Sequence, residues 1–383
     1  MPKKKKFKVV FTGGGSGGHS IPIIAVCREM KKILGEENVI FYYLGPADPL
    51  TKVLLPDEGI KIKGILSGKL RRYINLKSVI LNFVDLFKIP LGFLQSFLYL
   101  FFIYPNLIFS KGGFGSLGPN LAGWLLGIPL FLHESDSVAG LSNRICGFFA
   151  KKVFLSFKQT LHFSQKKIIF TGNPIRKELL EGKREEAIEY FKITKEKPVI
   201  LILGGSQGAQ RINEKVLAIL NKLLEDFEVI HQCGFLNFKK MKTITKVLIK
   251  EELKKYYHLF PFLKEEELKK AYAICDLVIS RAGAGTIFEI AALGKPSILI
   301  PLPESAQNHQ LKNAYIFASA GAAILIEERN LTPDFFLGTI KNLFSNPKKM
   351  EEMRKAALKF AKPEAAKEIA QYLVSYLTKE KSF

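Results

Sequence analysis

The sequence is poor in cysteine and tryptophan, and it lacks several motifs that would assign a function directly. Its four cysteines lie far apart and form no CxxC or Cys/His cluster, which excludes a disulfide framework and a zinc site and indicates buried thiols in a reducing cytoplasm. No GxxxxGK[ST] motif occurs, so a P-loop NTPase is not predicted. The basic residues 3–6 lead into an apolar run of only a few residues, which is too short for a signal peptide.

Acidic residues are also scarce, 35 against 57 lysines and arginines, and the formal net charge is +22. Such a charge suits nucleic acid, an anionic membrane surface or phosphorylated substrates, although a lysine-rich composition alone would give the same value. The sequence contains no helix-turn-helix pattern, RNP aromatic motif or zinc knuckle, so we do not expect a nucleic-acid partner.

Long uninterrupted apolar runs are missing, with one near exception at residues 89–110. This stretch has no charged residue and is long enough to cross a bilayer, but Pro90, Gly92 and Pro105 interrupt it. Residues 106–110 have the composition of a short buried strand. We therefore predict a helix followed by a core strand, no transmembrane span, and peripheral contact with the membrane.

The clearest pattern that is present is a duplication. Residues 8–12 form an apolar run that leads into a glycine loop at 13–19 and a helical pattern at 21–34, and residues 198–224 repeat this order. Strand and helix patterns alternate in both halves, which predicts an α/β protein with parallel sheets. We expect two Rossmann-like domains facing a central ligand cleft. Their bounds are 1–172 and 198–362, with a linker at 173–197 and a last helix in 363–383 that is a candidate to pack back on the first domain.

Four glycine-rich loops, at 13–19, 111–119, 204–209 and 281–286, each lie next to an apolar strand. Free N–H groups at a helix start, and the absence of a Cβ, allow such loops to hold phosphates. The strand predicted at 39–44 ends without the carboxylate of an NAD site, and no Asp-x-Asp pair is present to hold a divalent ion. We therefore expect a diphosphate bound by helix N-termini and basic residues, with no metal and no cofactor.

Five blocks carry a more specific signal through their order and spacing. They are TGGGSGGH (12–19), GGFGSLGP (112–119), HE with AGLSN (133–134 and 139–143), GNPIR with GGSQG (172–176 and 204–208), and SRAGAGT with Glu289 (280–286). QNHQLKN (307–313) also fits. Over essentially the whole chain these blocks resemble the MurG family, the UDP-GlcNAc transferases that complete lipid II.

The resemblance implies the GT-B fold and an inverting hexosyltransferase that serves peptidoglycan synthesis, and through it cell shape and division. The donor would be UDP-GlcNAc, and the acceptor the C4 hydroxyl of undecaprenyl-pyrophosphoryl-MurNAc-peptide. The enzyme would lie at the cytoplasmic face of the bacterial plasma membrane, on an anionic surface.

The resemblance also implies roles for individual residues. Leu263 would offer backbone hydrogen bonds to uracil, Glu289 would accept hydrogen bonds from the ribose hydroxyls, and a helix start at 284–286 would meet the diphosphate. The remaining donor-site residues implied are Arg176 and Ser206 near the diphosphate or nucleoside, Ala284, Gly285 and Thr286 at that helix start, and His309, Gln310 and Asn313 at the sugar. The first domain would complete the cleft with Ser16, Gly17, Gly18 and Asp136.

Three residues depart from the family pattern. Ser16 stands where Thr is frequent, which keeps the hydroxyl, and Phe114 stands where Tyr is frequent. Asp136 stands where Asn is common, and an extra negative charge near donor and acceptor phosphates leaves its role open.

Inversion at the sugar needs a base that takes the proton from the attacking hydroxyl. His19 is the first choice, because it ends a glycine loop and an imidazole titrates near neutral pH. Its alternative role is to bind acceptor phosphate without proton transfer. Glu134 is the second candidate, as a base or as a residue that orients His19 or the acceptor, and its alternative is a buried structural carboxylate.

Residues 69–88 mix basic and apolar side chains, which fits either a membrane-binding surface or an ordinary amphipathic helix that faces the domain core. Trp124 could belong to the same membrane-binding surface or pack in the hydrophobic core. Two other enzymes would share the fold: a UDP-sugar-dependent diacylglycerol glycosyltransferase and a UDP-GlcNAc 2-epimerase. The His19 loop and the Gln310 block favour the transfer to a muramyl lipid.

Overall fold

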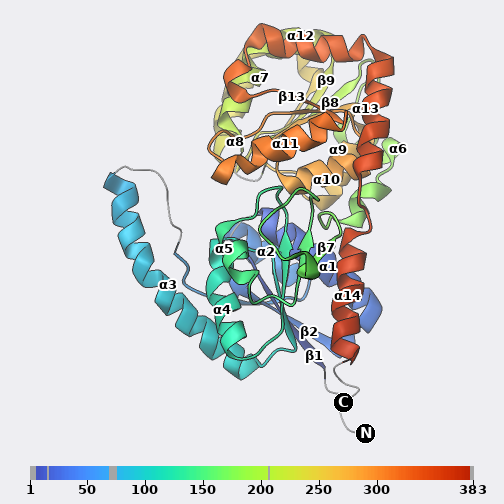
Figure 1. Ribbon diagram of the computed structural model, residues 1–383. Helices are drawn as coiled ribbons and strands as arrows, with labels where there is room; N and C mark the ends of the chain where they lie inside the picture. Colours follow the sequence, from blue (N-terminus) through green and yellow to red (C-terminus); the bar gives the residue numbers. More distant parts are fainter. Residues whose placement is uncertain (1–5, 15–16, 69–75, 206–207, 380–383) are drawn as a thin grey trace. The chain divides into compact units, whose positions relative to one another are not determined.

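The computed structural model describes residues 6–14, 17–68, 76–205 and 208–379, which form two compact units (Figure 1). Unit 1 comprises residues 1–176 and 363–383, and unit 2 comprises residues 177–362. Residues 177–197, expected to contain a linker, form η4 (Lys177–Glu181) and α6 (Arg184–Phe191), and both pack against α9 of unit 2.

Unit 1 is built on a seven-stranded parallel sheet of order β3-β2-β1-β4-β5-β6-β7. Its strands are β1 (Phe7–Thr12), β2 (Val39–Gly45), β3 (Lys61–Gly64), β4 (Leu107–Ser110), β5 (Leu130–Glu134), β6 (Lys152–Leu155) and β7 (Ile168–Phe170). Its helices are α1 (Gly17–Leu34), α2 (Pro49–Asp57), α3 (Leu76–Ile103), α4 (Leu117–Leu125), α5 (Leu141–Cys146) and α14 (Ala365–Lys379). The strand order reverses between β1 and β4, and open α/β sheets bind ligands at such a switch point.

Both faces of this sheet are buried, as the continuous apolar strands predict. Val9 and Phe11 of β1 belong to one apolar cluster, and the intervening Val10 belongs to another on the opposite face. The last helix, α14, packs on α1 and adds Leu373 and Leu377 to the cluster of Val9. Residues 363–383 are therefore part of unit 1, although unit 2 precedes them in the chain.

Unit 2 repeats the architecture with a six-stranded parallel sheet of order β10-β9-β8-β11-β12-β13. Its strands are β8 (Val199–Leu203), β9 (Glu228–Gln232), β10 (Tyr257–Phe260), β11 (Leu277–Ser280), β12 (Ser297–Leu299) and β13 (Ala323–Leu325). Its further helices are α7 (Gln210–Asp226), α8 (Phe235–Leu248), α9 (Glu265–Ile274), α10 (Ala284–Ala292), α11 (His309–Ser319), α12 (Pro333–Phe344) and α13 (Pro347–Phe360).

Helix α3 differs from the other helices of unit 1 in its exposure. It packs on α4 near its carboxyl end, and its amino-terminal part extends away from the sheet (Figure 1). Within it, residues 85–103 are long and apolar enough to cross a membrane, and only 22% of the most apolar window is buried. The predicted order of a helix followed by a core strand is confirmed, because the helix ends at Ile103 and the buried strand β4 follows. Pro90 and Gly92, expected to interrupt the stretch, lie inside the helix.

Candidate active site

The loops that follow β1 and β4 pack closely around the imidazole of His19. A Cβ added at Gly14 would lie 2.9 Å from His19 Cε1, and one added at Gly113 would lie 2.8 Å from His19 Nε2. Gly113 also has φ +84°, a backbone that L-residues rarely adopt. Glycine at both positions therefore lets the two loops close on the imidazole.

His19 belongs to the first turn of α1, which begins at Gly17, four residues before the predicted start. Gly17 is buried and Gly18 is exposed. The amino end of a helix favours negative charge, so this turn is a place for a phosphate or a developing anion. Ser16, which the resemblance places beside them, lies outside the described residues.

Glu134 ends β5 and is almost fully buried. Its carboxylate accepts hydrogen bonds from the backbone of Asp136 (3.1 Å) and Gly140 (2.9 Å) and from Asn143 Nδ2 (2.9 Å). Burial raises the pKa of Glu134, and the nearby charge of Asp136 raises it further, against these hydrogen bonds. The three donors hold the loop after β5 in place, so the contacts of Glu134 resemble those of an orienting residue.

Two buried residues beside this site, Lys111 and His133, were missed by the sequence reasoning. Lys111 Nζ lies 2.5 Å from His133 Nδ1 and 2.5 Å from Ser135 Oγ, and both Lys111 and His133 are buried. Burial lowers the pKa of Lys111 to about 7, although the charges of Glu134 and Asp136 act in the opposite direction. A lysine directly after an apolar strand and before two glycines is a signal that could have singled it out.

In unit 2 the residues assigned to the donor follow β8, β10, β11 and β12, and the carboxyl ends of these parallel strands share one edge of the sheet. Leu263 is buried, and its N–H donates to Gln232 Oε1 at 2.9 Å. Gln232 Nε2 in turn donates to Gly205 O at 3.3 Å. The side chain of Gln232 therefore links the expected uracil contact to the glycine loop after β8; Ser206 of that loop lies outside the described residues.

Space is free beside the glycines at the start of α10. A Cβ added at Gly283 or Gly285 would meet no atom within 4 Å. Glu289 lies on the same helix, α10, and is buried, and it accepts a hydrogen bond of 3.2 Å from the hydroxyl of Tyr272 on α9. The structure thus supplies a helix N-terminus with free space at its glycines, which suits a phosphate, and a carboxylate whose orientation a tyrosine stabilises. Thr286, in the first turn of α10, is half-buried.

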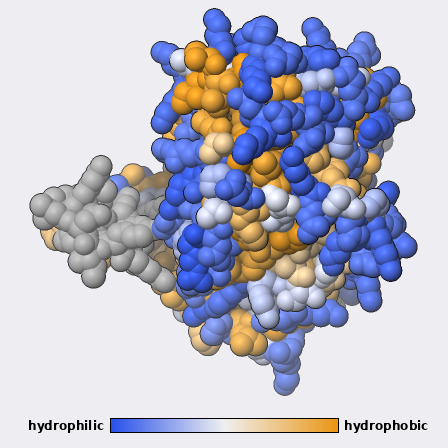
Figure 2. All heavy atoms as spheres, turned by 90° about the horizontal axis from the view of Figure 1, so that it is seen from above, coloured by the Kyte–Doolittle hydropathy of each residue, from blue (hydrophilic) through white to orange (hydrophobic). Residues whose placement is uncertain are grey.

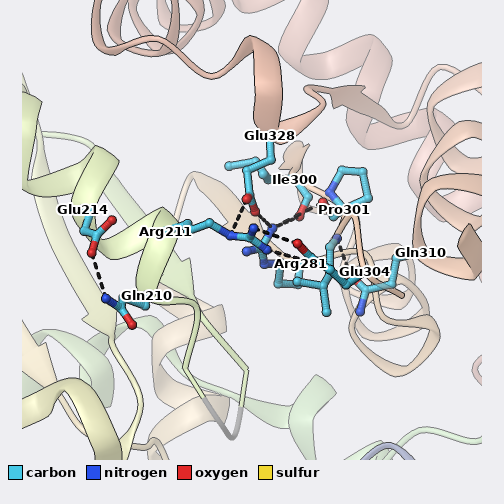
Figure 3. Close-up of polar contacts among 10 residues, drawn as sticks. Gln210, Arg211, Glu214, Arg281, Ile300, Pro301, Glu304, Gln310 and Glu328 are labelled. Carbon is cyan, nitrogen blue, oxygen red and sulfur yellow. Dashed lines mark hydrogen bonds and ion pairs between the residues drawn. The ribbon is translucent and has the colours of Figure 1, made fainter. Parts of the chain in front are cut away.

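An ion-pair network lies next to the loop that contains Arg281 (Figure 3). Glu328 pairs with Arg281 Nη1 at 2.5 Å and with Arg211 Nε at 2.5 Å, and Arg211 also pairs with Glu304. Arg281 further donates to the backbone carbonyls of Ile300 and Pro301. The network ties the loop after β11 to the loop after β12.

The residues expected to read the sugar lie on the first turns of α11. Gln310 Oε1 accepts from Leu302 N at 2.9 Å, which holds its amide against the loop after β12 (Figure 3). His309 Nδ1 donates to Ala306 O at 2.8 Å, and Asn313 is fully buried one turn later. Arg176, assigned to the same substrate, is buried as the last residue of unit 1.

The chain is similar to known proteins over almost its whole length. Residues 9–155 match the glycosyltransferase family 28 N-terminal domain, and residues 199–369 match its C-terminal domain. The chain is 38% identical to UDP-N-acetylglucosamine–N-acetylmuramyl-(pentapeptide) pyrophosphoryl-undecaprenol N-acetylglucosamine transferase 2 of Bacillus cereus, over 96% of this chain and 99% of that protein. The chain is also 36% identical to the UDP-N-acetylglucosamine–N-acetylmuramyl-(pentapeptide) pyrophosphoryl-undecaprenol N-acetylglucosamine transferase of Treponema pallidum, over 96% of this chain and 95% of that protein.

Solved structures agree at the level of the fold. Acinetobacter baumannii MurG is 26% identical, with a TM-score of 0.71, over 96% of this chain and 99% of that one. A UDP-N-acetylglucosamine 2-epimerase, 17% identical with a TM-score of 0.65 over 98% of both chains, shares the fold alone.

Proposed function

This chain belongs to the MurG family of UDP-GlcNAc-dependent hexosyltransferases and has its GT-B fold, and on that premise we propose how its residues divide the work. The enzyme transfers GlcNAc from UDP-GlcNAc to the lipid-linked N-acetylmuramyl-peptide, lipid I, and forms lipid II in peptidoglycan synthesis. Most donor determinants belong to unit 2, with Arg176, Ser16, Gly17, Gly18 and Asp136 added from the first part of the chain, and the proton-transfer determinants belong to unit 1.

On the donor side, the N-terminus of α10 receives the diphosphate. Ala284, Gly285 and Thr286 present N–H groups there, and the open space at Gly285 supports this role. As the reaction proceeds, negative charge grows on the leaving UDP, and fixed dipoles aimed at that charge lower the barrier. No group of three or more metal-ligating side chains occurs among the described residues, and we assign the charge stabilisation to this helix and to Arg176.

The nucleoside and the sugar take the other donor residues. Leu263 offers its backbone to uracil, Glu289 accepts from the ribose hydroxyls, and Ser206 lies by the diphosphate. His309, Gln310 and Asn313 read the sugar hydroxyls. The hydrogen bonds that hold Glu289 and Gln310 support these roles, because a pre-oriented side chain loses less entropy on binding.

On the acceptor side, His19 is the base that takes the C4 proton while that oxygen attacks the anomeric carbon opposite the leaving UDP. The observation that carries this assignment is the packing of the His19 imidazole against Gly14 and Gly113 at the switch point of the unit 1 sheet. Gly17, Gly18 and Asp136 belong to the same unit and are assigned, with Ser16, to UDP-GlcNAc. Glu134 remains a second candidate, and its three hydrogen bonds favour an orienting role.

Transfer of labelled GlcNAc from UDP-GlcNAc to a short-chain lipid I analogue tests both the assigned acceptor and the role of His19. We expect acceptor-dependent product from the wild type and at least about a 100-fold loss of kcat in His19→Ala, as is usual for removal of a general base. A variant with wild-type kcat would refute the role of His19 alone. Wild-type activity on diacylglycerol, with none on the muramyl lipid, would instead overturn the acceptor.

The second part of the proposal is that the enzyme binds an anionic membrane surface at the cytoplasmic face of the plasma membrane. We propose no nucleic-acid partner. The support is a row of exposed apolar side chains on α3: Phe83, Leu86, Phe87, Leu91, Leu94, Leu98, Phe101 and Phe102. By contrast, most of the face shown in Figure 2 is hydrophilic, with smaller apolar patches. The basic residues expected beside this row at 69–72 lie outside the described residues.

Vesicle sedimentation tests this contact. Phe102→Ser on α3 should weaken binding to anionic vesicles by about tenfold or more, because burying one phenylalanine side chain in an apolar medium contributes about 1.5–3 kcal/mol. Val247→Ser, at a similarly exposed apolar position on α8 of unit 2, is the matched control. Equal binding of both variants and the wild type would argue against the role of α3.

A further inference from the structure

Lys111 is a buried cation to which the mechanism above gives no task. It directly follows β4, and its side chain is 3% exposed. A charged amine in such a place is costly unless hydrogen bonds and opposite charges compensate it. Both kinds of compensation are present, and they come from the segment that contains Glu134 and Asp136.

The hydrogen bonds form a chain with a defined direction that starts at Lys111. His133 Nε2 lies 3.1 Å from Gly172 O, and because a carbonyl oxygen only accepts, Nε2 carries the proton and Nδ1 accepts from Lys111. Ser135 Oγ accepts from Lys111 and donates to Asn173 Oδ1 at 2.9 Å. One ammonium group thus connects the loops after β4, β5 and β7.

The charges around Lys111 are unequal. Glu134 and Asp136 both act on it electrostatically, so two carboxylates share one buried cation. The other titratable groups nearby are the neutral imidazole of His133, whose pKa burial lowers, and His19, which packs on Gly113 two residues from Lys111. If Lys111 loses its proton or its amine, this edge of the sheet becomes more negative.

We propose that Lys111 is a positioning residue that supplies the counter-charge for Asp136 and Glu134, and that this charge allows the edge to accept a substrate carrying phosphates. The inference rests on the proposed placement of the acceptor at this edge. It explains why an aspartate is tolerated at 136 beside phosphates: the aspartate and the lysine act as a pair. Lys111 itself touches neither substrate.

The pair makes a prediction that a purely structural lysine would not. In Lys111→Met the carboxylates of Glu134 and Asp136 lose this buried cation, so the KM for the lipid I analogue should rise by about tenfold or more, while the KM for UDP-GlcNAc stays within about twofold. In Lys111→Met/Asp136→Asn the surplus charge is removed, and the acceptor KM should return to within about threefold of that of Asp136→Asn alone. Lys151→Met, at an exposed lysine of the same unit, controls for the loss of one positive charge.

The pH profile is a second measurement, and it needs no Lys111 variant to fold. The acceptor KM of the wild type should rise between about pH 6 and about pH 8, as a group that titrates near pH 7 loses its proton. The rise should be smaller in Asp136→Asn, because this variant has one negative charge fewer near the neutral amine of Lys111. If His19 is the base, its protonation on the acidic side would lower kcat, and this effect is distinct from a rise of the acceptor KM on the basic side.

Three outcomes would overturn the inference: an unchanged acceptor KM in Lys111→Met, a double variant that is no better than Lys111→Met, or identical pH profiles for the wild type and Asp136→Asn. These outcomes differ from failure of the proposed function, in which the wild type itself would not transfer GlcNAc to the lipid I analogue.

Discussion

Replacing Gly113 with alanine should damage catalysis by displacing His19, and the same replacement at Gly127 should not. Both glycines have a positive φ, +84° at Gly113 and +69° at Gly127. A Cβ at Gly127 would meet no atom within 4 Å, whereas one at Gly113 would lie 2.8 Å from His19 Nε2 and 3.0 Å from Gly14 Cα and N. The two variants therefore share the strain of a positive φ, and only Gly113→Ala also disturbs the imidazole and the loop of Gly14 that packs on it.

The expected sizes follow from these contacts. The left-handed backbone costs an alanine about 1–3 kcal/mol at either position, which lowers the Tm by about 2–4 °C per kcal/mol for a unit of this size. To restore an ordinary contact of 3.4 Å, the imidazole must retreat by 3.4 − 2.8 = 0.6 Å. A 1 Å misplacement of a reacting group can cost about 100-fold, so we expect kcat of Gly113→Ala to fall by about 10- to 100-fold.

The assay is steady-state transfer to the lipid I analogue, with thermal unfolding and UDP binding measured on the same preparations. UDP affinity should be unchanged in both variants, because neither Gly113 nor Gly127 is assigned to the donor site. If Gly113→Ala keeps a kcat within about twofold of that of Gly127→Ala, the contact between this loop and His19 has no catalytic role, and the assignment of the base loses its structural support.

The remaining predictions concern the donor site and stability. Tyr272→Phe removes a donor to the Glu289 carboxylate, so the KM for UDP-GlcNAc should rise by about tenfold at nearly constant kcat; a change in kcat alone would contradict the positioning role. Glu328→Gln removes the negative charge between Arg281 and Arg211. It should lower the free energy of unfolding by about 1–3 kcal/mol and raise the KM for UDP-GlcNAc. A variant as stable as the wild type would show that the ion-pair network is dispensable for stability. Burial lowers the pKa of Lys111 from 10.5 to about 7. Between these two pH values Lys111 therefore carries a proton in the unfolded chain and not in the folded one, so this group makes the free energy of unfolding rise with pH in that window. Urea unfolding of Lys111→Met should lack that part of the rise, and an unchanged slope would contradict the lowered pKa.

The fold could be predicted from the sequence because its signals are local. Apolar runs followed by glycine loops marked β1 with α1 and β8 with α7, and the alternation of strands and helices is typical of parallel sheets. Helix α1 begins earlier than predicted because Gly17 and Gly18, read as loop residues, form its first turn. Pro105 lies between the end of α3 and β4, whereas Pro90 and Gly92, also read as interruptions, are inside the helix.

The candidate site was only partly accessible in the same way. His19, Glu134 and Glu289 could be named because each lies in a short motif with its own chemistry. Tyr272 lies 17 residues from Glu289, and Gln232 lies 31 residues from Leu263. No local pattern connects either pair, so their contacts had to come from the structure.

The sequence by itself determined the α/β class, the duplicated strand, glycine loop and helix, and the loops that suit phosphates, since backbone propensity and periodicity act over a few residues. The tertiary structure decided which side chains share an edge. Lys111 follows β4, His133 is near the end of β5 and Gly172 follows β7; they are separated by 22 and 39 residues and meet because parallel strands end on the same side of the sheet. Burial at that edge then shifts the proton affinity of Lys111, and burial depends on the whole fold.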